Sequence, residues 1–148
     1  MRVFRLCRAD RSDFDGEGAR IAGGRWNAPG LRLVYTAGSE ALAILELLVH
    51  VSPQQIPSDH VCIPAEVPDP LIESLPEDAL PSDWRRNPAA TSRLGSRWLR
   101  AGASAVLRVP SVVVPREWNY LINPAHPAFP TLAVQPALPI EFDPRLWK

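Results

Sequence analysis

Prolines interrupt this chain along its whole length. Seventeen of the 148 residues are proline, about twice the usual share of roughly 5%. Proline has no backbone N–H to donate, ends or kinks helices, and is excluded from the middle of a central strand. Because the prolines are spread through the chain, the sequence predicts many ordered loops rather than one long linker.

Length and composition indicate one domain over residues 1–148. The apolar fraction of 46% is ordinary, and a chain of this length can bury a core without disulfides or metals. The formal net charge is zero, which favours neither direct nucleic-acid binding nor an anionic membrane. Cys7 and Cys62 are far apart and match no metal-ligand spacing, and the charged N-terminus lacks the apolar core of a signal peptide. We therefore expect a cytoplasmic protein without a metal site.

Turn signals, caps and apolar patterns predict an α+β domain, in which helices flank a mixed or antiparallel sheet. Ser39 is a good N-cap for a helix Glu40–Val49, while Asn87–Pro88 and Gly102 bound a second helix. The expected strands are Val3–Leu6, Leu31–Thr36, His60–Val67, Ala105–Val109, Val112–Val114, Thr131–Val134 and Ile140–Phe142. Residues 11–30 and 115–130 are expected to be long loops, rich in Gly or in Pro and Asn.

Glu46 is the most informative single residue. It lies in the segment ALAILELLV, which is apolar nearly all round and so predicts a buried helix. Burying an unpaired charge costs roughly several kcal/mol, so a buried carboxylate must be paired, protonated or exposed to a cavity. The sequence leaves two interpretations open: a cleft-lining carboxylate, or a surface pair with His50 one turn later.

The segment Gly23-Gly24-Arg25-Trp26 is a candidate ligand-binding loop. Two glycines allow the backbone to approach a ligand closely, and the planar guanidinium of Arg25 suits phosphate or carboxylate. The alternative is a turn in which Arg25 stacks on Trp26.

Four further side chains are candidates, each with a structural alternative. Tyr35 ends a strand and either faces a cleft or is half-buried. Ser111 follows Pro110 and is either a site residue or a turn hydroxyl. Asn119 either contacts a ligand or caps its own turn, and Arg5 on the first strand is either functional or solvated.

Three arginines, Arg93, Arg97 and Arg100, share one face of the second predicted helix. Such a stripe is usually a solvated face, although an acidic partner would also fit it. Walker, GxSxG, HExxH and paired CxxC motifs are absent from the sequence, which removes several common enzyme classes.

Taken in order, four segments resemble the RES-domain family, which is named for an Arg, a Glu and a Ser. They are VFRL, GEGARIAGGRWNAPG, LVYTAGSEALAILELLVH and VPSVVVPREWNYLINPAHPAF. They cover most of the chain from Arg5 to Phe129, whereas residues 52–103 carry less of the signature. Arg25, Tyr35, Glu46 and Ser111 stand where the family pattern expects them, and Arg5 and Asn119 also match.

The resemblance implies a fold similar to ADP-ribosyltransferase toxins and an enzyme that cleaves NAD⁺ by hydrolysis or phosphorolysis, with phosphate as a second substrate in the latter case. It also implies an Xre-type antitoxin that blocks the active site, and it is compatible with a homodimer inside a toxin–antitoxin hetero-oligomer. NAD⁺ is the substrate, so no cofactor is expected. Family members that transfer ADP-ribose to a protein supply the main alternative, and a non-catalytic binding module that docks through its arginine face is a third.

The implied mechanism assigns a role to each matched residue. Glu46 stabilises an oxocarbenium-like ribose, as carboxylates do in glycosidases. Arg25, with Arg5, holds the pyrophosphate, and Tyr35 packs on the nicotinamide or its ribose. Ser111 positions the substrate or Glu46, and Asn119 is a further substrate contact.

Overall fold

One sheet runs through the protein in a computed structural model that describes residues 1–52, 54–55 and 57–147. Its strands follow the order β4-β5-β6-β2-β1-β3-β7, and β8 also pairs with β3. Only β4 and β5 pair in parallel among the described strands, so the predicted mixed sheet is confirmed. The strands are β1 (Arg2–Arg8), β2 (Val34–Ala37), β3 (His60–Glu66), β4 (Ile72–Ser74), β5 (Val106–Pro110), β6 (Trp118–Ile122), β7 (Ala133–Val134) and β8 (Leu138–Pro139).

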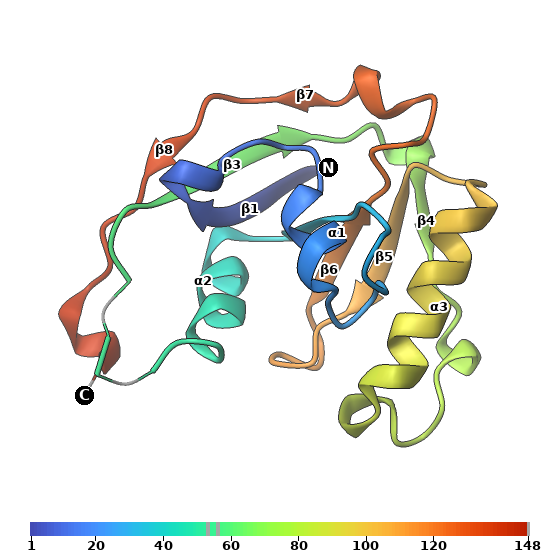
Figure 1. The fold of residues 1–148 in the computed structure, drawn as a ribbon, viewed down its shortest axis with the longest axis horizontal. Helices are drawn as coiled ribbons and strands as arrows, with labels where there is room; N and C mark the ends of the chain where they lie inside the picture. The colour runs from blue at the N-terminus through green and yellow to red at the C-terminus, as the bar shows by residue number, and fades with distance from the viewer. Residues whose placement is uncertain (53, 56, 148) are drawn as a thin grey trace.

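In the described part of the chain, three α-helices accompany the sheet (Figure 1): α1 (Glu17–Ala22), α2 (Glu40–Leu48) and α3 (Pro88–Ala101). The predicted caps are confirmed. The Ser39 hydroxyl accepts a hydrogen bond from the backbone N–H of Leu42, and Asn87 does the same for Ala90. Gly102 ends α3 in the left-handed conformation that favours glycine. Short 3₁₀ turns cover Ala9–Arg11, Asp69–Leu71, Glu77–Ala79, Trp84–Arg86, Phe129–Thr131 and Pro144–Trp147.

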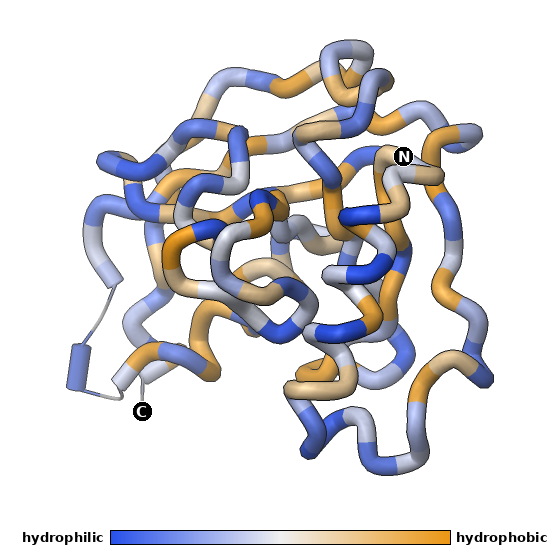
Figure 2. The backbone as a smooth tube through the Cα atoms, turned by 45° about the vertical axis from the view of Figure 1, so that its right-hand side comes forward, coloured by the Kyte–Doolittle hydropathy of each residue, from blue (hydrophilic) through white to orange (hydrophobic). Residues whose placement is uncertain are grey.

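Helices α2 and α3 cover the same face of the sheet. Leu42 of α2 packs near Ala37 of β2, while Trp98 of α3 packs with Leu107 and Leu121 of β5 and β6. The opposite face is covered by the segment around Leu132, which packs on the side chains of alternate strand residues. In Figure 2 short hydrophobic stretches alternate with hydrophilic ones along the chain.

The sheet is split between its two middle strands. β1 and β3 are joined by seven registered residue pairs, but β1 and β2 share a single pair, Phe4 with Ala37. Beyond that pair the strands diverge, and α2 packs against both of them. The split therefore opens a space between β1, β2 and α2.

Three local expectations were wrong. Residues 115–130 are not one loop, because they contain β6, a central strand. Val112–Val114 is not a strand, because the Ser111 hydroxyl accepts hydrogen bonds from the backbone N–H groups of Val113 and Val114 and turns the chain. Residues 11–30 contain α1, which begins after Gly16 in the left-handed conformation.

The ends of the sheet also differ from expectation. The strand expected at Ile140–Phe142 lies earlier, at β8, and that expected at Thr131–Val134 shrinks to β7. Among the described residues, none of the helices combines the length and the apolar character that a membrane span requires.

Candidate active site

Two adjoining cavities occupy the split in the sheet. The first, of about 270 Å³, is mostly apolar and lies between β1, β2 and α2. The second, of about 350 Å³, is bordered by Gly23, Gly24 and Arg25. Four residues line both cavities: Tyr35, Glu46, His50 and Asn119. Together they form a cleft of the size that binds small molecules, with an apolar half and a polar half.

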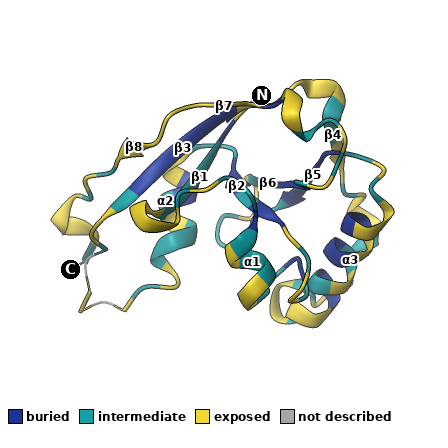
Figure 3. Cartoon of the chain, turned by 45° about the horizontal axis from the view of Figure 1, so that its top comes forward, coloured by how far each residue is buried: buried dark blue, intermediate teal, exposed yellow. Residues whose placement is uncertain are grey.

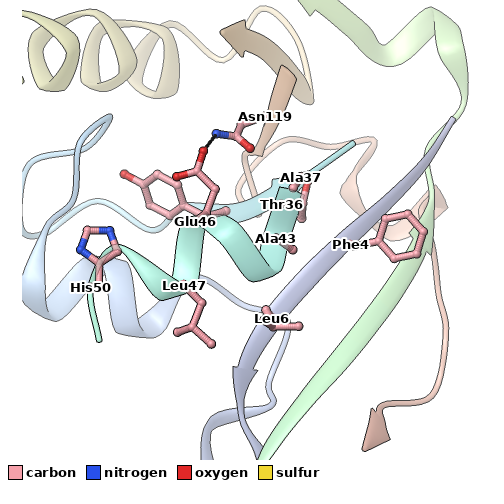
Figure 4. Close-up of a pocket in the computed structure, with 10 residues that line it drawn as sticks. Phe4, Leu6, Thr36, Ala37, Ala43, Glu46, Leu47, His50 and Asn119 are labelled. Atoms are coloured by element: carbon pink, nitrogen blue, oxygen red, sulfur yellow. Dashed lines mark hydrogen bonds between the residues drawn. The ribbon is translucent and has the colours of Figure 1, made fainter. Parts of the chain in front are cut away.

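Glu46 lies where the two halves meet. Its carboxylate Oε1 accepts hydrogen bonds from the Ser111 hydroxyl and from the Asn119 amide Nδ2, each at 2.7 Å. Figure 4 shows Asn119 reaching Glu46 from β6, while His50 projects from the turn that follows α2. Within the described residues Glu46 forms no ion pair with His50, so the surface-pair interpretation is wrong and the cleft interpretation holds.

The prediction that α2 is buried all round was also wrong. Leu45 and Val49 are 40% and 59% exposed, and only one side of the helix packs on the sheet. The apolar stretch therefore covers the sheet on one side and presents Glu46 to the cleft from its edge.

Ser111 supports Glu46 from behind. It is fully buried, it is not among the residues that line either cavity, and its hydroxyl both closes the turn to Val114 and donates to Glu46. The sequence left a turn hydroxyl and a site residue as alternatives, and the structure gives Ser111 both contacts.

Asn119 contributes through both ends of its amide. It pairs across the sheet with Ala37 and Val109, which directs its side chain to the face covered by α2. Its Nδ2 donates to Glu46, while its Oδ1 is buried without a hydrogen-bond partner among the described residues. An unpaired buried acceptor is costly, so a donor from a ligand would stabilise it.

Tyr35 is locked to the glycine-rich loop. Its hydroxyl donates to Asn27 Oδ1 at 2.6 Å and accepts from the backbone N–H of Trp26 at 3.0 Å. Burial raises the pKa of the Tyr35 phenol to about 12, against the weaker lowering effects of the backbone N–H groups of Trp26 and Asn27 and of the nearby Arg25 charge. A Cβ added at Gly24 would lie only 2.5 Å from the Tyr35 hydroxyl oxygen, so this close approach requires glycine.

Arg25 lines the polar half of the cleft. Its guanidinium makes two long contacts, each 3.4 Å, to the backbone carbonyls of Trp84 and Arg85. These neutral acceptors leave the positive charge of Arg25 uncompensated by any acidic partner among the described ion pairs. The arrangement suits an anionic group of a ligand.

Helix α3 holds the loop that carries Arg25. Thr91 donates a hydrogen bond to the Arg25 carbonyl at 2.7 Å, and the Ser96 hydroxyl accepts one from the backbone N–H of Ala28 at 3.0 Å. Between them Gly95 lets the loop lie directly on the helix, because a Cβ there would overlap the Trp26 carbonyl. The inner face of α3 is thus shaped to this loop.

Arg5 is the predicted residue that the structure leaves apart from the others. It does not line either cavity; its Nη2 donates weakly to the Arg11 carbonyl at 3.4 Å, and its Nη1 is buried without a partner among the described residues. The cleft instead gathers Arg25, Tyr35, Glu46 and Asn119, with Ser111 behind them.

Two residues of the site were not predicted from the sequence. His50 lines both cavities. Its position one helical turn after Glu46 is the signal that could have placed it in the site, although the same spacing also fits a surface pair. Asn27 is 1% exposed and joins Tyr35 to the carbonyls of Ala19 and Leu31. No local pattern distinguishes this asparagine from a turn former.

The chemistry of this cleft is that of a fixed carboxylate opposite a cationic loop. Within the described residues, no group of three or more His, Cys, Asp and Glu side chains is placed to hold a metal ion. The site can bind a ligand with an anionic part beside Arg25 and stabilise positive charge beside Glu46.

The chain is similar to known proteins over most of its length. A family model described as the RES domain matches residues 2–143. The chain is 39% identical to the Prs ADP-ribosylating toxin of Sphingobium sp. over 93% of this chain and 88% of that protein. It is 42% identical to Toxin Res of Yersinia enterocolitica over 91% of each chain.

The fold has a solved counterpart. A chain in the crystal structure of the M. tuberculosis MbcT–MbcA toxin–antitoxin complex superposes with a TM-score of 0.72 and 19% identity. The match covers 99% of this chain and 86% of that chain. At this level of identity the similarity confirms the α+β toxin fold.

Proposed function

The chain belongs to the RES-domain family, and from that membership we propose that it is the toxin of a toxin–antitoxin pair that breaks the bond between nicotinamide and ribose in NAD⁺. Relatives of 39% and 42% identity are named as toxins, which supports the first part. The second part is supported by the cleft itself.

The observation that carries the proposal is the setting of Glu46. Its carboxylate lies at the junction of an apolar and a polar cavity, held by Ser111 and Asn119. When nicotinamide leaves, the electron pair of the C–N bond neutralises the positive ring nitrogen, and positive charge develops on the ribose. A carboxylate already oriented in a partly water-excluded cleft stabilises that charge without reorganising.

Arg25 and the two glycines before it complete the binding of the substrate. The guanidinium would hold the pyrophosphate by charge-assisted hydrogen bonds, and the glycine backbone allows close approach. The ring of Tyr35 lines both cavities and would pack on the nicotinamide or its ribose. Since the Tyr35 hydroxyl is already bonded to Asn27 and Trp26, its role is packing and not proton transfer.

Capture of the ribosyl cation completes the reaction. Water yields ADP-ribose and releases a proton, whereas phosphate yields the 1″-phosphate of ADP-ribose. An Xre-type antitoxin that covers the cleft in the cytoplasm would keep this activity silent. A homodimer within a larger assembly with that antitoxin is compatible with the proposal.

A second candidate is transfer of ADP-ribose to a protein. It is favoured by one specific observation, the name of the Sphingobium relative as an ADP-ribosylating toxin. Bond cleavage by Glu46 is common to both candidates, and only the acceptor differs.

The test is to incubate the purified chain, freed of any partner, with NAD⁺ and to measure nicotinamide release with and without phosphate. Release in either buffer supports the proposal, and dependence on phosphate identifies phosphorolysis. If nicotinamide appears only when lysate protein becomes labelled from labelled NAD⁺, the acceptor is a protein. Folded protein that releases none and labels nothing would leave the non-catalytic binding module.

The first prediction concerns Glu46→Gln. Glutamine keeps the shape and a hydrogen-bond acceptor for Ser111 and Asn119 but removes the charge, so we expect nicotinamide release to fall by about a hundredfold or more. Glu40→Gln is the matched control, because Glu40 is exposed on the same helix and lies outside both cavities. Unchanged NAD⁺ cleavage by folded Glu46→Gln protein contradicts the assigned role.

A further inference from the structure

Charge is unevenly distributed along this neutral chain. Residues 59–83 contain seven Asp and Glu and neither Lys nor Arg. Residues 84–116 contain seven Arg and neither Asp nor Glu. A net charge of zero therefore conceals two adjacent segments of opposite sign.

The basic segment is exposed and unpaired along α3. Arg93, Arg97 and Arg100 are all exposed, and Figure 3 shows the outer side of α3 as exposed and its inner side as buried. Within the described residues none of their guanidinium groups forms an ion pair or a hydrogen bond. The arginines that do form ion pairs lie elsewhere: Arg2, Arg8, Arg20, Arg32 and Arg145.

These three arginines border one hollow. A cavity of about 360 Å³ lies along the edge of α3, where its exposed side meets the loop at Ala28, and is lined by them together with Ala28, Ser92 and Ser96. The spacing i, i+4, i+7 places the arginines on one side of the helix. Like charges at that spacing destabilise a helix slightly, and an anionic partner would reverse the sign of the effect.

We propose that this arginine groove is the docking site for an acidic segment of a partner protein, whose Asp and Glu carboxylates pair with Arg93, Arg97 and Arg100. The planar fork of arginine matches a carboxylate in two parallel hydrogen bonds. The proposal rests on the charge and shape of this surface and is independent of the NAD⁺ chemistry proposed above.

A protein segment fits this surface better than nucleic acid. Duplex DNA carries about one negative charge per 1.7 Å and needs an extended basic track. The groove is short, with three arginines on about two turns of one helix, so it offers no such track. A short acidic segment can occupy the groove without extending beyond it.

The groove also adjoins the loop that carries Arg25. Ala28 lines it, and the backbone N–H of Ala28 donates to Ser96 of α3. The same loop carries Arg25 three residues earlier, held by Thr91. A partner docked in the groove therefore rests on the outer side of the platform that positions Arg25, without entering the cleft.

The experiment measures binding of a fluorescein-labelled hexaglutamate peptide by anisotropy, at low and at physiological salt. The test variant combines Arg93→Gln, Arg97→Gln and Arg100→Gln. The matched control combines Arg2→Gln, Arg8→Gln and Arg145→Gln, which removes the same charge from exposed, ion-paired positions. Thermal unfolding and nicotinamide release are followed for both, and both readouts should match the parent protein.

We expect the Kd of the peptide to rise about tenfold in the groove variant and less than about twofold in the control. The single variant Arg97→Gln, at the middle of the groove, should show an intermediate rise. Equal losses in the two triple variants would mean that only net charge matters, and would overturn the proposal. Absence of peptide binding, or tighter groove-dependent binding of a short DNA duplex, would overturn it as well.

Discussion

At the scale of single residues, Glu46 depends on side chains far away in the sequence. Ser111 and Asn119, which fix one oxygen of its carboxylate, are separated from it by 65 and 73 positions. Hydrogen bonds to a charged group are stronger than neutral ones, at roughly 1.5–3 kcal/mol. Two such bonds hold the carboxylate in one orientation, which is what a preorganised catalytic charge requires.

Ser111→Ala tests this support. The substitution removes a donor to Glu46 and leaves the backbone N–H groups of Val113 and Val114 without their acceptor. We expect the free energy of unfolding to fall by about 1–3 kcal/mol and nicotinamide release to fall more than stability alone explains. Urea unfolding and steady-state kinetics check both, with Ser74→Ala, exposed on β4, as the control. Parent-like turnover in Ser111→Ala would show that Glu46 does not need this donor.

Tyr35 makes stability sensitive to alkaline pH. Its phenol has a folded-state pKa of about 12, above the unfolded value of about 10. The unfolded chain therefore loses its proton first, and the stabilisation present below pH 10 or so is lost as pH rises toward the folded pKa. The loss from this group is about 3 kcal/mol, because each of the two pKa units is worth roughly 1.4 kcal/mol.

Urea unfolding at a series of alkaline pH values, with Tyr35→Phe beside the parent, checks this prediction. Cys62, whose pKa burial raises to about 11, acts in the same direction in both proteins. The difference between the two curves therefore isolates Tyr35. Parallel curves for parent and variant would contradict the prediction.

At the scale of elements, α3 is a platform with two distinct faces. Its inner face holds the loop from Arg25 to Ala28 through Thr91, Gly95 and Ser96. Its exposed side carries the three arginines that border the arginine groove. Glycine in the middle of a helix normally costs roughly 0.5–1 kcal/mol relative to alanine, so a tertiary contact explains Gly95.

A matched pair of glycine substitutions tests that explanation. Gly95→Ala puts a methyl group into the Trp26 carbonyl, and we expect destabilisation of about 1–3 kcal/mol or more. Gly18→Ala, in α1 with open space around it, should instead stabilise by about 0.5–1 kcal/mol. Thermal unfolding of both variants gives the answer. If Gly95→Ala were as stable as the parent, the close packing of loop and helix would not hold.

At the scale of the whole molecule, the split sheet decides where function can lie. A continuous β1–β2 ladder would close the space that Glu46, Tyr35 and Asn119 line. The fully paired β1 and β3 beside it form a rigid wall. The same register places Cys7 opposite Val61 and Cys62 opposite Leu6, so the two thiols project from opposite faces of the sheet.

The two cysteines report on global unfolding. Burial raises the pKa of both thiols, that of Cys62 to about 11, so little of either thiol is ionised at pH 8. We expect slow alkylation in the folded protein, slower for Cys62, and fast alkylation of both in urea. Because they face apart, they should form no intramolecular disulfide under oxidising conditions. Mass spectrometry of alkylated samples measures both, and rapid labelling of folded Cys62 would contradict the burial.

Much of the candidate site could be predicted from the sequence, but not its arrangement. Glu46 was identified because a carboxylate in an apolar helix needs a cavity or a partner, and Tyr35, Arg25 and Asn119 do lie beside it. His50 and Asn27 were not identified as site residues, since their roles depend on neighbours brought in by other segments.

The sequence by itself determined the features that local contacts control. The starts of α2 and α3 and the end of α3 follow from Ser39, Asn87 and Gly102, whose caps involve residues within a few positions. Only the tertiary structure decided that Trp118–Ile122 is a central strand and that Val112–Val114 is a turn. Strand pairing and the bond from Ser111 to Glu46 join distant segments, and a pattern of neighbouring residues carries no information about which distant partner is chosen.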